Sequence, residues 1–157
     1  MPPTRSRSSG GGPATGPFDR ALLILAGRPH SAAELRLKLR RRGHDADEVE
    51  SALTRLRELG YLDDAAFAQS LVGWRSRSRG RRAIASELAA RGVPREVSAA
   101  VLAEVDPEAE LAAAQALLAR SLRDRGDERE LSRAVAKLRR RGFDADTIQS
   151  ALRAFAE

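Results

Sequence analysis

Two copies of one sequence pattern, 99 residues apart, decide the fold. Residues 39–53 read LRRRGHDADEVESAL, residues 138–152 read LRRRGFDADTIQSAL, and eleven of the fifteen positions are identical. A more divergent third copy lies midway, at residues 88–101, so that Arg-Gly pairs end at Gly43, Gly92 and Gly142. A repeat period of about fifty residues is typical of proteins built from tandem structural units.

Each copy combines the end of one helix with the beginning of the next. The glycine stands where helices commonly end in a left-handed residue, and an aspartate such as Asp45 follows as a candidate N-cap. Other expected helix starts are the capping box Ser31 to Glu34, Asp63, Pro94, Asp106 before Pro107, and Asp127 with Glu130. Because fifty residues hold three helices of about 10–14 residues with short turns, the pattern predicts three-helix repeats.

We therefore expect an all-α protein with nine helices in three tandem repeats. The predicted boundaries are 18–62, 63–105 and 106–157, and the array should be elongated and curved because each repeat mainly contacts its neighbours. Residues 1–17, rich in Pro, Gly and Ser, are expected to form a disordered tail.

The composition agrees with thin cores between small helical layers. Of 157 residues, 29 are Ala and only 34 are Leu, Ile, Val or Phe, which argues against one large core. Within the helices, the expected buried stripes include Val49, Leu53, Leu56 and Leu59. The chain contains no cysteine, and no apolar run approaches the ~20 residues needed to span a bilayer. With no signal-peptide segment at the start, these features predict a soluble cytoplasmic monomer that does not contact a membrane.

The sequence contains no recognisable catalytic constellation. Asp63 and Asp64 are adjacent, so they should point apart on a helix, and His30 and His44 belong to no group with metal-ligand spacing. No phosphate-binding glycine loop or nucleophile elbow occurs. We therefore expect no enzymatic activity, no metal and no cofactor.

Basic clusters are the strongest functional signal. The net charge is +6, and residues 75–82 carry five arginines in eight positions without an acid between them. These are Arg75, Arg77, Arg79, Arg81 and Arg82. A helix running from Asp63 to Arg79 would place Arg75 and Arg79 on one face, where their mutual repulsion favours a polyanionic partner. We expect this stretch to lie at the junction of the first and second repeats; a solvated linker is the alternative.

Two arginine triplets end predicted helices, where cations also complement the helix dipole. They are Arg40, Arg41 and Arg42, and Arg139, Arg140 and Arg141. Tyr61, Phe67 and Trp74 are expected to be buried, which leaves little support for binding of single strands by base stacking. Contacts to phosphates or to acidic protein surfaces fit these clusters better.

Residues 60–68 read GYLDDAAFA and, with the Arg-Gly phasing, resemble the central signature of the bacterial RecX recombinase regulators. The signature positions are Gly60, Tyr61, Leu62, Asp63, Asp64, Phe67 and, further on, Trp74. The resemblance extends over about residues 18–157.

The resemblance implies a regulator that binds the RecA recombinase and its filament on single-stranded DNA. Such a protein would lower the ATPase, strand-exchange and coprotease activities of the recombinase, by blocking filament growth or by promoting disassembly. From the arginine clusters we also expect weak binding to single-stranded DNA, without sequence preference and sensitive to salt. Two alternatives remain open: a stand-alone DNA-binding module of helix-turn-helix type, and a purely structural adaptor.

Overall fold

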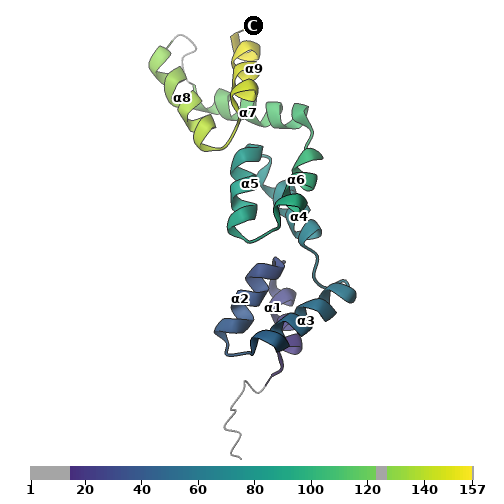
Figure 1. The fold of residues 1–157 in the computed structure, drawn as a ribbon. Coiled ribbons are helices and arrows are strands. Elements are labelled where there is room, and N and C mark those ends of the chain that lie inside the picture. Colours follow the sequence, from purple (N-terminus) through teal and green to yellow (C-terminus); the bar gives the residue numbers. More distant parts are fainter. Residues whose placement is uncertain (1–14, 123–126, 157) are drawn as a thin grey trace, which may run out of the picture. The chain divides into compact units, whose positions relative to one another are not determined.

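The computed structural model describes residues 15–122 and 127–156, and these form nine α-helices and no strand (Figure 1). The helices are α1 (Pro17–Gly27), α2 (Ala32–Arg41), α3 (Ala46–Glu58), α4 (Asp64–Arg75), α5 (Arg81–Ala90), α6 (Arg95–Ala103), α7 (Pro107–Ser121), α8 (Glu128–Arg140) and α9 (Ala145–Ala156). The predicted all-α class with nine helices is confirmed. Most of the expected tail, residues 1–14, lies outside the described residues, and Pro17 already begins α1.

The chain divides between residues 62 and 63 into two compact units. In the first unit, α1, α2 and α3 enclose one core that includes Leu35, Leu39, Leu53 and Leu56. Leu59, which the sequence places in this core, is instead 54% exposed. The reason is local: α3 ends at Glu58, so Leu59 is the C-cap and its side chain leaves the buried stripe.

The second unit contains two cores. Helices α4, α5 and α6 contribute Phe67, Leu71, Ile84, Leu88 and Val101 to one of them. Helices α7, α8 and α9 form the other, whose buried members are Ala114, Leu117, Leu118, Ala134, Leu138, Phe143, Ile148 and Ala151. Each core is therefore built by three consecutive helices, as the repeat predicts.

The helix termini follow the local sequence signals closely. Ser31 and Glu34 form a complete capping box, and Asp45, Asp63, Asp106 and Asp127 each accept hydrogen bonds from amides of the following turn. Gly43, Gly60, Gly92 and Gly142 all have positive φ, as expected for left-handed residues after a helix. Pro94 is shifted by one position from the prediction, because it is the N-cap of α6 and the helix begins at Arg95.

Within the described residues, no helix combines the length and the apolar character needed to cross a bilayer.

Candidate nucleic-acid and filament interface

The five-arginine stretch is not one continuous helix. Helix α4 ends at Arg75, the amides of Ser78 and Arg79 bond to the Arg75 carbonyl, and α5 begins at Arg81. Because α4 and α5 share one core, the stretch lies within a three-helix group. The expected helix to Arg79, and the expected location between the first and second repeats, are therefore wrong.

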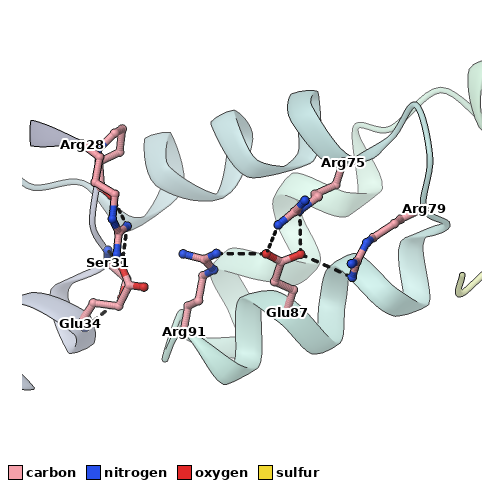
Figure 2. Close-up of polar contacts among 8 residues, drawn as sticks. Arg28, Ser31, Glu34, Arg75, Arg79, Glu87 and Arg91 are labelled. Atoms are coloured by element: carbon pink, nitrogen blue, oxygen red, sulfur yellow. Dashed lines mark hydrogen bonds and ion pairs between the residues drawn. The ribbon is translucent and has the colours of Figure 1, made fainter.

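Glu87 of α5 neutralises part of this stretch (Figure 2). Arg75 donates to both carboxylate oxygens at 2.9 Å, from Nε to Oε2 and from Nη2 to Oε1. Arg91 donates to Oε1 at 3.1 Å, and Arg79 Nη1 lies 3.8 Å from Oε2. The hydrogen bonds from Arg75 hold the pKa of Glu87 below its usual range, and they raise the pKa of Arg75 in return. Arg75 and Arg79 therefore share an acidic partner, although no acid lies within residues 75–82.

Arg81 is also occupied within the fold. Its Nη2 donates to the Val105 carbonyl at 2.6 Å, and its Nε lies 2.8 Å from Oε2 of buried Glu110, an ion pair rather than a well-aligned hydrogen bond. The backbone amide of Arg81 donates to Oε1 of the same carboxylate at 2.9 Å. Arg81 therefore ties the beginning of α5 to α7, and so joins the two cores of the second unit.

The loop between α4 and α5 packs directly on the turn between α8 and α9. Gly80 N donates to the Arg141 carbonyl at 2.9 Å, Arg82 N donates to the Gly142 carbonyl at 3.2 Å, and Arg141 Nη1 donates to the Ser78 carbonyl at 3.1 Å. The approach is so close that a Cβ on Gly80 would collide with the backbone of Gly142. The C-terminal copy of the duplicated sequence, residues 138–152, is thereby placed beside the five-arginine stretch.

Three exposed arginines flank this contact in the sequence, and we call them the junction arginines: Arg82 lies in the first turn of α5, and Arg139 and Arg140 lie at the end of α8. Their side chains make no hydrogen bond or ion pair with the part of the chain that the structure describes. Arg82 lies close enough to contribute to the lowered pKa of Asp144, whose main cause is the hydrogen bond from the Thr147 amide. The junction arginines therefore present guanidinium groups to solvent on a backbone fixed by the Gly80 contact.

The remaining predicted arginines lie elsewhere. Arg77 is exposed beside a hollow of about 400 Å³ that also borders Asp106. Arg40, Arg41 and Arg42 end α2 in the first unit and are exposed. The sequence thus identified the basic segments, and the structure separates arginines that hold the fold from arginines that face solvent.

Two of the three aromatic expectations are wrong. Phe67 is buried, but Trp74 is 77% exposed and Tyr61 is 59% exposed. Near the end of α4, the buried face consists of Leu71 and the half-buried residues Val72 and Arg75. Arg75 turns toward Glu87, and Trp74 is left on the exposed side of the helix. The Arg75 guanidinium lies 5.9 Å from the Trp74 ring centroid. Because Trp74 is exposed, its predicted burial no longer argues against binding of single strands by base stacking.

The other signature positions lie where the chain passes from the first unit to the second. Gly60 has a φ of 79°, buried Leu62 completes the first core, and Asp63 caps α4 through the amides of Ala65 and Ala66. Asp64 is the first residue of α4.

Comparison with known proteins identifies close relatives. Family models described as the first and second three-helix domains of RecX match residues 18–56 and 63–102. The chain is 46% identical over 123 residues to regulatory protein RecX of a Thermus thermophilus strain, covering 78% of this chain and 80% of that protein. It is 42% identical over 149 residues to the RecX protein of Halorhodospira halophila, covering 88% of each.

The fold is shared with solved structures as well. The crystal structure of RecX from Lactobacillus salivarius superposes with a TM-score of 0.82 at 18% identity, over 89% of this chain and 94% of that one. A second crystal structure of regulatory protein RecX gives a TM-score of 0.77 at 22% identity, over 85% of this chain and 69% of that one. Because both three-helix models match, and relatives exceed 40% identity over most of the chain, the protein belongs to the RecX family of regulatory proteins.

Proposed function

We propose that this chain is a non-enzymatic regulator of the RecA recombinase. It binds the recombinase and its filament on single-stranded DNA, and it lowers the ATPase, strand-exchange and coprotease activities of that filament. The observation that carries the proposal is the group of junction arginines, exposed beside a tightly packed turn of a RecX-family fold. The protein acts as a cytoplasmic monomer and needs no cofactor.

The chemistry of these side chains suits a nucleoprotein surface. A guanidinium group binds phosphate or carboxylate through two parallel hydrogen bonds, so it can contact either the DNA backbone or acidic recombinase side chains. Arg141 and Arg81 hold the supporting backbone in place, through Ser78 and Glu110 respectively. Binding to a preorganised surface loses less conformational entropy, so fixing the backbone favours affinity.

Replacing the three junction arginines by alanine should weaken inhibition of recombinase ATPase at least tenfold, equivalent to ~1.4 kcal/mol of binding. The measurement is the ATPase rate of the recombinase on single-stranded DNA while the wild-type protein or the triple variant is titrated in. Far-ultraviolet circular dichroism should be unchanged, because the three side chains are exposed and make no hydrogen bond or ion pair within the described structure.

A matched control removes the same charge from the same unit. Arg95, Arg129 and Arg153 are exposed and belong to α6, α8 and α9, with Arg129 in the first turn of α8 and Arg140 at its other end. Their triple replacement by alanine should leave inhibition within about twofold of wild type, a difference of ~0.4 kcal/mol. Equal losses in the two variants would assign the effect to net charge and refute the junction surface.

Binding to single-stranded DNA alone should be weak, independent of sequence and strongly dependent on salt. If three phosphates are neutralised, the logarithm of the association constant should fall with the logarithm of salt concentration with a slope of about −2. Fluorescence anisotropy of labelled oligonucleotides measures this slope. A flat salt dependence would contradict phosphate contacts, and a footprint at one preferred sequence would favour the helix-turn-helix alternative.

A further inference from the structure

A second basic site lies in the first unit. It is a hollow of about 390 Å³ between α1 and α2. Five nitrogen-bearing side chains line it: Arg20, Arg28, His30, Lys38 and Arg42. Leu23, Ile24 and Gly27 complete the wall, and no carboxylate contributes to it.

Arg20, one of the residues that line this hollow, carries an unsatisfied donor. Its Nε is buried and has no hydrogen-bond partner in the described structure. Leaving a buried charged donor without an acceptor is costly, so such atoms in proteins normally face an anion, a carbonyl or an ordered water. Arg20 therefore brings a positive charge without an acidic partner among the described residues to the wall of the hollow.

His30 and Lys38 form an ordered pair in the same wall. The buried His30 ring donates from Nδ1 to the Arg28 carbonyl at 2.9 Å, and its Nε2 accepts from Lys38 Nζ at 2.7 Å. Burial lowers the pKa of His30, which keeps the ring neutral at pH 7 and able to accept this bond. An ammonium group has three donors, so Lys38 is held in one direction and retains two donors for a ligand.

The positive charge of the hollow is only partly balanced. Glu34, outside the wall, lies 3.5 Å from Arg28 and also completes the capping box with Ser31 (Figure 2). Among the residues that the structure describes, the Arg42 side chain donates only to the Lys38 carbonyl, at 3.4 Å. Arg20, Lys38 and Arg42 thus have no acidic partner among the described residues, although they line one small space.

We propose that this hollow binds a phosphate group, with Arg20, Lys38 and Arg42 as its charged donors. Several donors converging from two helices match the three or four oxygens of a phosphate, which a single carboxylate would not use. Leu23, 63% exposed at the wall, offers an apolar surface on which the base of a mononucleotide can pack. None of the junction arginines lines this site, so its test does not depend on the proposed regulatory role.

Isothermal titration calorimetry of the full chain with inorganic phosphate tests the site, with potassium chloride at equal ionic strength as the blank. We expect saturable binding at one site with a Kd of about 1 mM or tighter. A parallel titration with AMP identifies the source of the phosphate: tighter binding of AMP indicates a mononucleotide site, and equal affinity indicates recognition of the phosphate alone. Heat that does not saturate with either probe would overturn the proposal.

Variants on one helix provide the specificity control. Lys38→Gln and Arg42→Gln, each made separately, should weaken phosphate binding about tenfold, since each removes one charged donor. Arg40→Gln and Arg41→Gln remove the same charge from exposed positions of α2 that do not line the hollow, and should leave the affinity unchanged. Arg20→Gln adds a direct test of the buried donor. If the control variants lose as much affinity as Lys38→Gln and Arg42→Gln, phosphate binds by net charge and no site exists here.

Discussion

Replacing Gly142 by alanine should destabilise the second unit by about 2–5 kcal/mol, the largest effect we expect from any single methyl group in this chain. Gly142 has a φ of 84°, a conformation that costs an L-residue roughly 1–2 kcal/mol. In addition, its new Cβ would overlap the backbone nitrogen and the Cβ of Ala83, and such overpacking typically costs about 1–3 kcal/mol. Urea unfolding followed by circular dichroism measures the change.

The duplicated sequence supplies the control for this variant. Gly43 occupies the same position in the first copy with a φ of 87°, but a Cβ there would meet no atom within 4 Å. Gly43→Ala should therefore cost only the strain of the left-handed conformation, about 1–2 kcal/mol. The amides of Gly80 and Arg82, which donate across the contact, should lose hydrogen-exchange protection in Gly142→Ala and keep it in Gly43→Ala. Equal destabilisation by the two variants would contradict the close packing of Gly142 against Ala83.

The helices could be predicted from the sequence because their signals are local. An N-cap such as Asp45 or Asp127 satisfies amides two or three residues away, and each Arg-Gly pair needs only its own turn. The Arg-Gly pairs ending at Gly43, Gly92 and Gly142 then indicate how these local elements are grouped into three-helix cores. The errors in this part are small, such as Pro94 displaced by one position.

The division of labour among the arginines could not be predicted in the same way. Arg75 pairs with Glu87, 12 positions further along the chain, and the Arg81 amide bonds to Glu110, 29 positions further. Nothing in residues 75–82 indicates these partners, because the acids are separated from the arginines by a turn or by whole helices. The same pairing explains the exposure of Trp74, since the end of α4 turns Arg75 inward toward Glu87. The sequence therefore locates the basic segments, and only the packing of α5 and α7 shows which cations remain available.

Replacing Glu87 by glutamine should destabilise the protein by about 2 kcal/mol at pH 7. The change removes the negative charge that accepts from Arg75 and Arg91 and lies near Arg79, and it leaves three guanidinium groups around a neutral amide. The Glu87 side chain is 15% exposed, so these charge-assisted bonds are less screened than those of a surface pair, but solvent at the Arg75 side limits the cost. Urea unfolding at pH 7 measures the difference from wild type.

The pH dependence of this difference separates the charge from the packing of the side chain. Hydrogen bonds from Arg75 lower the pKa of Glu87 in the folded state, so its contribution is fully present above the unfolded pKa of about 4.3. It is lost as the pH falls through the lower folded pKa, and the wild type and Glu87→Gln should then converge in stability. Glu96→Gln, at an exposed position of α6, is the control and should change stability by less than about 0.5 kcal/mol at either pH. A deficit in Glu87→Gln that persists undiminished in acid would show that the side chain acts through packing alone, and that the arginines around it gain nothing from its charge.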